Sequence, residues 1–387
     1  MSAEEKSSIL HIYYTSWKHE SRCFRGGAAA LEAALATKIV YAGHLANSLL
    51  PEQDIDTAQH ITRLQPMLSA DHHNRSSRVH GLGTWYREIY RRWSSDPSIA
   101  LVHCHGLASL PISVALKLRL DVPLLYDAHE LETERHGWSF KTRLVAKIVE
   151  RALIGFADHS IVVGESILDW YRRAYPGKRF SLVRNLPALA PSSGGGRALR
   201  KEAGVPESDL LCVYVGVLGA GRGIEKLIET FRRLPENRHM AFVGFGELAE
   251  MAKAAARERP NIHYFDAVPW NEVVEFIRSA DIGIFLSASN ALNEHFVAPN
   301  KMYEYATARL ALLCNDGPDM RAFIDKHRLG WTFDGSIDDA VVKLKALDPV
   351  EVRAFSREEK PPLPTWEQEK GVLVSIYGDM LKNSVGH

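Results

Sequence analysis

The sequence has few cysteines, and no two of them lie close together. Cys23, Cys104, Cys212 and Cys314 are spread over 387 residues, and no CxxC motif occurs. A zinc knuckle or a CxxC redox motif is therefore not expected. Cys104, Cys212 and Cys314 fall in apolar, strand-like runs, which predicts that they are reduced residues of the core.

An excess of charge of one sign is also absent. Lys and Arg total 47, Asp and Glu total 47, and the formal net charge is zero. Nothing in this balance favours binding to nucleic acid, and no zinc finger, basic arm or RNA-binding aromatic signature occurs. No apolar run approaches the ~18 residues needed to span a bilayer, and the N-terminus lacks an apolar signal region. We expect a cytoplasmic protein with no nucleic-acid partner.

Short apolar runs alternate with helical patterns, which is typical of parallel sheets covered by helices. The length, together with a Pro-, Ser- and Gly-rich stretch at 187–196, predicts two domains. We expect an α/β fold with two Rossmann-like, doubly wound domains: residues 1–190 with a terminal helix at 366–387, and residues 191–365. Strands are expected at 9–14, 37–42, 100–104, 123–127, 160–163, 181–184, 210–215, 239–243, 262–265, 282–286 and 310–314, with an edge at 330–333. Two such domains facing each other would form a ligand cleft at the carboxyl ends of their strands.

The segment PNKMYEYA at 299–306 follows an apolar strand and reads as the start of a helix. A helix N-terminus presents free N–H groups and partial positive charge, which suits phosphate. Lys301 adds a full charge, and the Glu304 carboxylate, about one turn further on, can accept hydrogen bonds from two sugar hydroxyls. The pattern indicates a nucleotide-sugar site. An ordinary capped helix is the alternative.

The loop GAGRG at 219–223 also follows an expected strand and opens a helix. Its glycines let backbone N–H groups approach an anion, and Arg222 can bind a diphosphate through two N–H bonds. The loop is neither a Walker motif nor a GxGxxG fingerprint. A tight structural turn is the alternative, and it is the better interpretation of GFGE at 244–247.

In the first domain, two neighbouring strands end in polar residues: VHCH at 102–105 and YDAHE at 126–130. Alternation places His103 and His105 on one face. A metal site needs further ligands, and since none is nearby in the sequence we expect no metal. Core histidines are the alternative to a role in a cleft. Arg22, Arg25 and the Gly26–Gly27 pair can face an anionic ligand or lie in a solvated loop.

Two helical segments combine aromatic and basic residues, at 85–93 and 170–175. Such helices can lie on anionic lipid headgroups, although an aromatic stripe more often belongs to the core. Peripheral contact with the inner face of the cell membrane is therefore one of two interpretations. Asp54-Ile55-Asp56 has the DxD form of a metal–nucleotide site, but we expect it in a polar loop and discount it.

These residues together resemble the retaining GT-B glycosyltransferases of family 4 over nearly the whole chain. The motifs that carry the resemblance are HESR at 19–22, GG at 26–27, VHCH at 102–105, YDAHE at 126–130, VRN at 183–185, YVG at 214–216, RG at 222–223, VGFG at 243–246, ADI at 280–282 and PNKMYEY at 299–305. The terminal helix from Trp366 resembles the family segment that crosses back onto the first domain. The resemblance implies that the second domain binds a nucleotide-diphosphate sugar and the first binds the acceptor.

The resemblance also implies roles for residues. Glu304 matches a glutamate that holds the ribose hydroxyls, Arg222 falls where the family has a basic residue on the diphosphate, and His105 falls on a histidine near the transferred sugar. We expect catalytic roles for His105, Arg222 and Lys301. The expected donor-binding residues are Gly221, Arg222, Gly223, Gly244, Asn300, Lys301, Met302 and Glu304. The expected acceptor or sugar contacts are Arg22, Gly26, Gly27, His129, Glu130, Asn293 and Glu294.

Two positions depart from the family pattern: Phe296 replaces an earlier glutamate and Val217 replaces an arginine. The implied reaction is a metal-free, retaining hexosyl transfer, with no cofactor beyond the co-substrate, from a UDP-sugar, or alternatively a GDP-sugar, to a saccharide, lipid-linked or small-molecule acceptor in polysaccharide or glycoconjugate biosynthesis. A nucleotide-sugar 2-epimerase and a non-catalytic nucleotide-sugar-binding partner subunit are the alternatives.

Overall fold

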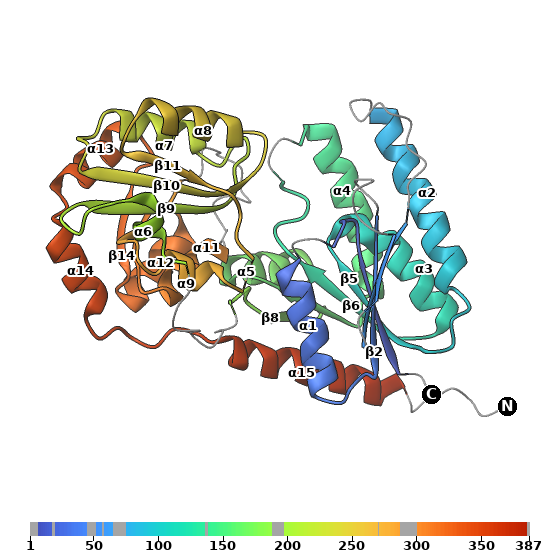
Figure 1. Cartoon of the computed structure of the whole chain (residues 1–387). Coiled ribbons are helices and arrows are strands. Elements are labelled where there is room, and N and C mark those ends of the chain that lie inside the picture. Colours follow the sequence, from blue (N-terminus) through green and yellow to red (C-terminus); the bar gives the residue numbers. More distant parts are fainter. Residues whose placement is uncertain are drawn as a thin grey trace. The chain divides into compact units, whose positions relative to one another are not determined.

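The structure is a computed structural model that describes residues 7–17, 20–44, 52–55, 58–64, 75–135, 138–187, 197–269, 271–286 and 300–384. It forms two compact units, Met1–Arg184 with Gln368–His387, and Asn185–Glu367. These divisions differ by a few residues from the domain limits expected at 190 and 365. Each unit is a sheet covered by helices on both faces, which confirms the predicted α/β fold (Figure 1).

The first unit is built on an eight-stranded sheet in the order β3-β4-β2-β1-β5-β6-β7-β8. All neighbours are parallel except β3, which pairs antiparallel with β4. Strands β3 and β4 are absent from the prediction, because they are short and carry few apolar residues. The strands are β1 (Ser8–Tyr13), β2 (Lys38–His44), β3 (Gln53–Ile55), β4 (Gln59–Leu64), β5 (Ile99–His105), β6 (Leu124–Ala128), β7 (His159–Val162) and β8 (Phe180–Leu182).

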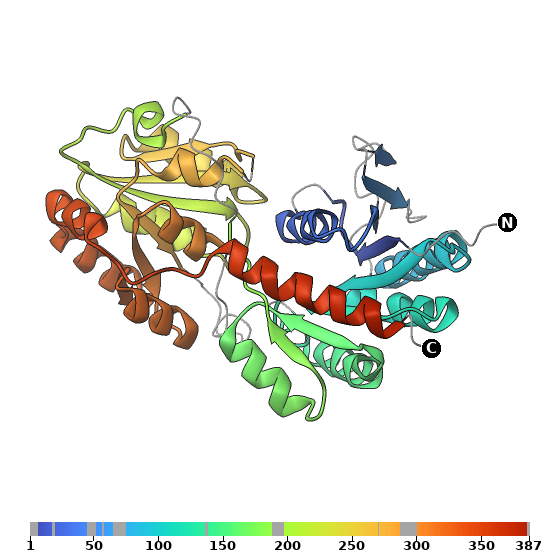
Figure 2. The same ribbon diagram turned by 90° about the horizontal axis from the view of Figure 1, so that it is seen from below.

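Helices from both ends of the chain cover one face of this sheet (Figures 1 and 2). The terminal helix α15 packs against α1 where Gly26 meets Leu373, and its Tyr377 hydroxyl lies 2.7 Å from Nδ1 of His103. The last helix thus belongs to the first unit. The helices are α1 (Ser21–Glu32), α2 (Arg75–Trp93), α3 (Leu110–Leu120), α4 (Phe140–Leu153), α5 (Glu165–Ala174) and α15 (Trp366–Ser384), with 3₁₀ turns at Leu107–Ser109 and Ile154–Phe156.

The second unit has a parallel six-stranded sheet in the order β11-β10-β9-β12-β13-β14. Two apolar clusters fill its faces, one under α7, α8 and α13 and one under α9, α11 and α12. The strands are β9 (Leu210–Val217), β10 (Arg238–Phe245), β11 (Ile262–Phe265), β12 (Ile282–Phe285), β13 (Ala311–Asn315) and β14 (Gly330–Phe333). The helices are α6 (Leu199–Ala203), α7 (Ile224–Arg232), α8 (Ala249–Glu258), α9 (Val273–Ile277), α11 (Asn300–Thr307), α12 (Pro318–His327), α13 (Ile337–Ala346) and α14 (Pro349–Arg357).

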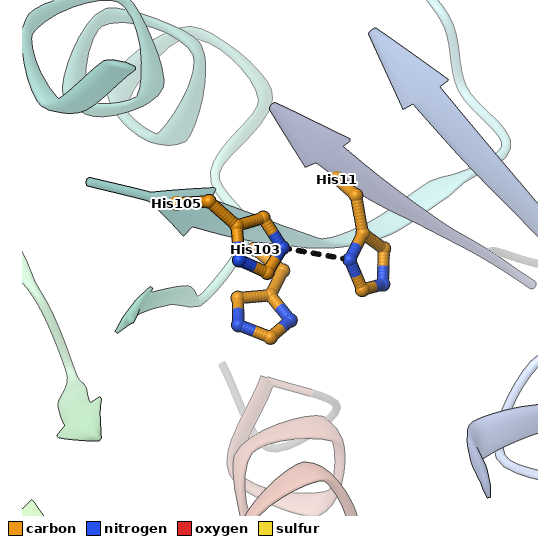
Figure 3. A group of neighbouring side chains, drawn as sticks. All are labelled: His11, His103 and His105. Carbon is orange, nitrogen blue, oxygen red and sulfur yellow. Dashed lines mark hydrogen bonds between the residues drawn. The ribbon is translucent and has the colours of Figure 1, made fainter. Parts of the chain in front are cut away.

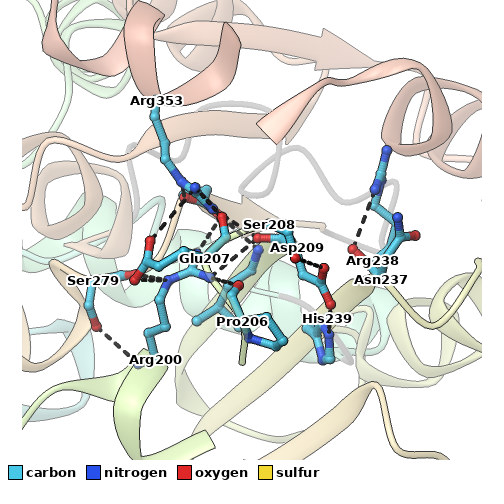
Figure 4. A network of polar contacts seen from close by, with 12 residues as sticks. Arg200, Pro206, Glu207, Ser208, Asp209, Asn237, Arg238, His239, Ser279 and Arg353 are labelled. Atoms are coloured by element: carbon cyan, nitrogen blue, oxygen red, sulfur yellow. Dashed lines mark hydrogen bonds and ion pairs between the residues drawn. The ribbon is translucent and has the colours of Figure 1, made fainter. Parts of the chain in front are cut away.

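A polar network ties helices to the amino-end edge of the second sheet (Figure 4). The buried Asp281 carboxylate accepts from Arg200 Nη2 at 2.6 Å and from Arg353 Nε at 2.7 Å. It also accepts from the backbone N–H of Leu211 at 2.8 Å. Because Asp281 and Leu211 lie at the amino ends of β12 and β9, this network secures the edge opposite to the one where ligands of such sheets bind.

Each sheet has one point where the chain reverses the direction in which it adds strands. In the first unit this switch lies between β1 and β5, and in the second between β9 and β12. Ligands of open α/β sheets bind outside the carboxyl ends of the strands at such a switch. Both candidate sites below lie at these points.

Burial of the aromatic stripes on α2 and α5 favours the core interpretation of these helices over lipid binding. On α2, the aromatic and aliphatic stripe of Trp85, Ile89 and Trp93 is at most 4% exposed. On α5, Tyr171 is fully buried and donates to Glu150 at 2.8 Å. The α2 stripe and Tyr171 are therefore core, whereas Trp170 and Tyr175 are half-buried. Among the described helices, none combines the length and apolar character needed to cross a bilayer.

Candidate functional site

Lys301 is a buried cation at the switch point of the second sheet. It is the second residue of α11 and is 7% exposed. Its Nζ lies 3.2 Å from the Tyr214 hydroxyl, 4.5 Å from the centroid of that ring and 5.4 Å from the centroid of Phe285. Among the described residues, no carboxylate pairs with it. A buried ammonium without an anionic partner is costly, so the site is suited to an anion.

Lys301 contacts the carboxyl end of β9, which leads into a glycine-rich loop. The Tyr214 hydroxyl that accepts from Lys301 donates in turn to the Val217 carbonyl at 3.0 Å. Gly216 has a φ of +119°, and a Cβ there would lie 3.4 Å from Lys301 Nζ. Glycine is therefore required where this backbone passes the ammonium.

The loop from Gly219 to Gly223 opens α7 with two left-handed residues, Gly221 at φ +77° and Gly223 at φ +72°. Gly223 is also packed so tightly that a Cβ would lie 2.6 Å from the Leu286 carbonyl oxygen. The Arg222 side chain is exposed and forms no ion pair with a described residue. The loop thus has structural reasons for its glycines and still presents an exposed guanidinium.

Gly244, another expected donor residue, has a structural role, and the neighbouring Glu247 contacts the glycine loop. Gly244 lies against Gly216 of the adjacent strand, where a Cβ would come within 1.8 Å of the carbonyl oxygen. Its glycine is therefore explained by strand packing alone. The Glu247 carboxylate accepts from the Ala220 N–H at 2.7 Å, so that donor of the loop is already occupied.

The remaining expected donor residues lie on α11, and two expected acceptor or sugar contacts, Asn293 and Glu294, precede it in the sequence. Met302 is fully buried in the core, and Glu304 is half-buried one turn after the helix start. Asn300 is the first residue of the helix. Asn293 and Glu294, like Phe296, lie outside the described residues.

In the first unit, three histidines gather at the switch point between β1 and β5 (Figure 3). His103 and His105 lie on one face of β5, as alternation predicts, and His11 of β1 pairs in register with His103. His11 Nδ1 lies 2.9 Å from His105 Nε2. On the other side of His105, Nδ1 lies 3.1 Å from Nε2 of His129. The imidazoles form a hydrogen-bonded chain from the core towards the surface.

A buried ion pair lies beside this chain. Arg22 donates to both Asp127 oxygens, at 2.8 and 3.0 Å, and to the Val183 carbonyl at 2.7 Å. Burial opposes ionisation of Asp127, but the Arg22 guanidinium, with His129 and His105, holds its pKa well below the usual range. Burial lowers the pKa of His105 to about 4, so its imidazole is neutral at pH 7.

Four first-unit residues that we expected to contact ligand are buried instead, and these expectations need correction. The His105 side chain has no exposed surface, and Arg22 is committed to Asp127. Gly26 packs on α15, and a Cβ on Gly27 would lie 2.1 Å from the Tyr41 hydroxyl. Close packing of α1 on α15 at Gly26 and on the sheet at Gly27, rather than an anionic ligand, explains the glycine pair.

Two expected contacts do reach the surface. The side chains of His129 and Glu130 are 17% and 32% exposed. Sequence reasoning missed His11 and Tyr377, which complete the histidine cluster. The alternation of the first strand could have placed His11 on the face of His103, whereas Tyr377 is distant in sequence and only the packing of α15 brings it there.

Two family models match the chain. The model described as Glycosyltransferase Family 4 covers residues 25–186, and the model described as Glycosyl transferases group 1 covers residues 197–347. The chain belongs to the glycosyltransferases. The resemblance to GT-B glycosyltransferases of family 4 is thereby confirmed, and the two matches fall on the two compact units.

Solved structures show the same GT-B fold at low identity. A sucrose-phosphate synthase from Thermosynechococcus elongatus is 15% identical, with a TM-score of 0.76 over 97% of this chain and 100% of that one. Anabaena Alr3699/HepE, solved with UDP-glucose, is 11% identical, with a TM-score of 0.66 over 98% and 99% of the two chains. These likenesses confirm the predicted GT-B fold.

A curated relative matches only a part of the chain. It is named as a candidate teichuronic acid biosynthesis glycosyltransferase, TuaC, of Bacillus subtilis (strain 168), and it is 28% identical over 130 residues. The match spans 34% of this chain and 31% of the relative.

Proposed function

We propose that this glycosyltransferase moves a sugar, with retention, from a nucleotide-diphosphate sugar to a saccharide, lipid-linked or small-molecule acceptor in glycoconjugate or polysaccharide biosynthesis. A UDP-sugar is favoured over a GDP-sugar. The observation that carries the proposal is Lys301, a buried ammonium with no carboxylate partner among the described residues. The UDP-glucose complex of HepE and the name of TuaC support the donor class and the pathway class.

The donor diphosphate would lie between the start of α11 and the glycine loop. Lys301 would compensate the charge on the leaving phosphate, with help from the α11 N-terminus and the exposed Arg222. Glu304 would accept hydrogen bonds from the ribose hydroxyls. In a retaining transfer on one face of the sugar, the leaving diphosphate takes the proton of the acceptor hydroxyl as the new glycosidic bond forms. The protein stabilises that leaving group without a divalent ion.

The acceptor would bind the first unit at the carboxyl ends of β1, β5 and β6. His129 and Glu130 are the expected residues that keep exposed surface there. His105 would act as a positioning residue, because its Nδ1 lies 3.1 Å from His129 and its own side chain is enclosed.

The test is the release of nucleoside diphosphate by Arg222→Ala, with Arg257→Ala as the matched control. Arg257 lies in α8 of the same unit and is also exposed. We expect turnover to fall by about a hundredfold in the first variant, as for loss of one charge-stabilising donor, and to stay within twofold in the control. Equal activities of both variants would contradict the role of Arg222.

A thermal-shift screen of UDP- and GDP-sugars identifies the donor, since a ligand at ~100 times its Kd stabilises by about 2.7 kcal/mol. Diphosphate release that depends on an added acceptor supports the transferase. Interconversion at carbon 2 without an acceptor would indicate an epimerase, and binding without turnover would indicate a partner subunit.

We also propose peripheral membrane contact, through α4 rather than the aromatic helices. Phe140, Leu144, Val145 and Ile148 lie on its outer side and are 48–81% exposed. Their helical spacing places them on one broad arc, and Lys141, Lys147 and Arg151 share it. An apolar face with interspersed basic residues suits an anionic lipid surface.

Vesicle flotation tests this contact. The wild type should bind phosphatidylglycerol-containing vesicles and bind pure phosphatidylcholine weakly. Phe140→Ser with Ile148→Ser should reduce binding about tenfold or more, since each apolar side chain contributes roughly 1.5 kcal/mol or more when buried. The control Val342→Ser, at an exposed position of α13 in the second unit, should bind as the wild type does. Unchanged binding of the double variant would refute the assignment to α4.

A further inference from the structure

The histidine chain of the first unit meets a thiol and a carboxylate around His105. The Sγ of Cys23 lies 3.5 Å from His105 Nδ1. The Nε2 of His129 lies 3.1 Å from the same nitrogen, and Oδ2 of Asp127 lies 3.5 Å from it. Asp127 Oδ2 and His129 Nε2 are 3.4 Å apart. Four potential ligand atoms of three chemical types thus converge from α1, β5 and the end of β6.

These four separations are close to those between ligands of a tetrahedral zinc site. With Zn–N bonds of about 2.05 Å and a Zn–S bond of about 2.3 Å, two nitrogens stand about 3.3 Å apart and a nitrogen stands about 3.6 Å from sulfur. The separations around His105 and His129 run from 3.1 to 3.5 Å. Cys23, His105 and His129 offer atoms that all lie within 4.8 Å of one another.

The surroundings orient these side chains as outer-shell partners of a metal site do. His105 Nε2 lies 2.9 Å from Nδ1 of His11, and in the tautomer that carries the proton on Nε2 the Nδ1 of His105 is the ligand atom. Arg22 donates to both oxygens of Asp127, Oδ2 included, and so fixes the orientation of the carboxylate. Partners of this kind fix the ring orientation and the carboxylate of a ligand set.

We propose that the first unit binds one Zn²⁺ through Cys23 Sγ, His105 Nδ1, His129 Nε2 and Asp127 Oδ2, as a structural site. Binding releases the Cys23 thiol proton to solvent, because the thiolate is the ligand. The thiolate supplies one negative charge, and the Asp127 carboxylate is shared between the ion and Arg22. The second trio, His11, His103 and His105, fits less well: His11 Nδ1 and His105 Nε2 are closer than two zinc ligands, and Nδ1 of His103 is held by Tyr377.

The site is independent of the proposed donor site, whose residues all belong to the second unit. Four protein ligands leave no open position for substrate, so the ion would stabilise the first unit and not polarise the diphosphate. Loss of zinc should therefore lower the melting temperature of the first unit while leaving the affinity for UDP unchanged. That pairing separates failure of this proposal from failure of the transferase assignment.

Metal analysis of the untagged, full-length protein, followed by titration of the metal-free protein with Co²⁺, tests the site. We expect about one zinc per chain, and on titration the visible bands of tetrahedral cobalt with a thiolate-to-cobalt charge-transfer band. Cys23→Ser should abolish the charge-transfer band, whereas Cys104→Ser, a buried thiol of the same sheet, should retain it. His129→Asn, at the most exposed ligand, should weaken cobalt binding at least tenfold.

Circular dichroism on each sample establishes that the variants are folded. Zinc-free wild type that binds no cobalt while folded would overturn the proposal. So would cobalt bound without a charge-transfer band, or a band that persists in Cys23→Ser, because either result would remove Cys23 from the ligand set.

Discussion

Replacing Lys301 by methionine is the most direct test of the donor site. The change removes the ammonium and keeps most of the side-chain volume, so α11 and the neighbouring Tyr214 and Phe285 rings keep their packing. In the free protein the ammonium has one hydroxyl and two aromatic rings around it, and no carboxylate partner among the described residues. Lys301→Met should therefore not lower the free energy of unfolding, since a buried unpaired charge is itself destabilising.

The effect on ligand binding should be large. A hydrogen bond to a charged group contributes about 1.5–3 kcal/mol, and loss of one such contact to the diphosphate weakens binding by roughly ten- to a hundredfold. Uridine, which lacks phosphates, should lose nothing. The affinity of the wild type for UDP should fall as salt is added, and that of the variant should fall less, because one charge is missing.

Isothermal titration with UDP, GDP and uridine measures these differences, and urea unfolding measures stability on the same samples. Lys326→Met is the matched control, because Lys326 is an exposed lysine of α12 in the same unit. Affinity for UDP within twofold of wild type in folded Lys301→Met would refute the anion site. A loss of stability above about 2 kcal/mol would show that the ammonium has an internal partner and does not await a ligand.

Four further results are expected. Glu304→Ala should weaken UDP and uridine alike, by about tenfold or more, and unchanged uridine affinity would remove Glu304 from the ribose. Brief exposure to EDTA should leave turnover within twofold, and rescue of lost activity by Mg²⁺ or Mn²⁺ would contradict the metal-free transfer. Gly27→Ala should cost about 1–3 kcal/mol of stability because its Cβ would displace Tyr41. The control Gly83→Ala lies in open space on α2 and should be neutral or stabilising. Equal stabilities of the two variants would refute the packing explanation. Burial raises the pKa of Glu150 to about 7, above the unfolded value near 4.3. Between these two pH values the native state keeps a proton on Glu150 that the unfolded state has lost, so the free energy of unfolding falls by on the order of 3 kcal/mol as pH rises through that window. Glu150→Gln should remove this pH dependence in urea unfolding.

Local sequence patterns determined the fold class and most strands. Apolar runs such as 210–215 and 282–286 have no alternative to burial on both faces, so their position in parallel sheets followed from composition and spacing alone. Helix starts and glycine loops could also be predicted from local sequence, since φ > 0 at Gly221 and Gly223 is a local requirement. The family motifs indicated the glycosyltransferase family correctly, because they are short segments read within one element.

Only the tertiary structure decided which polar residues are enclosed. His105 and Gly27 have local patterns compatible with a cleft, but the packing of α1 and α15 on the sheet buries them, and no short-range pattern encodes that cover. The exposed face of α4 is the opposite case: its apolar residues have the spacing of a buried helix face, but no described element covers them. Burial is set by contacts between residues such as His103 and Tyr377, 274 positions apart, and sequence periodicity carries no information about partners at that distance.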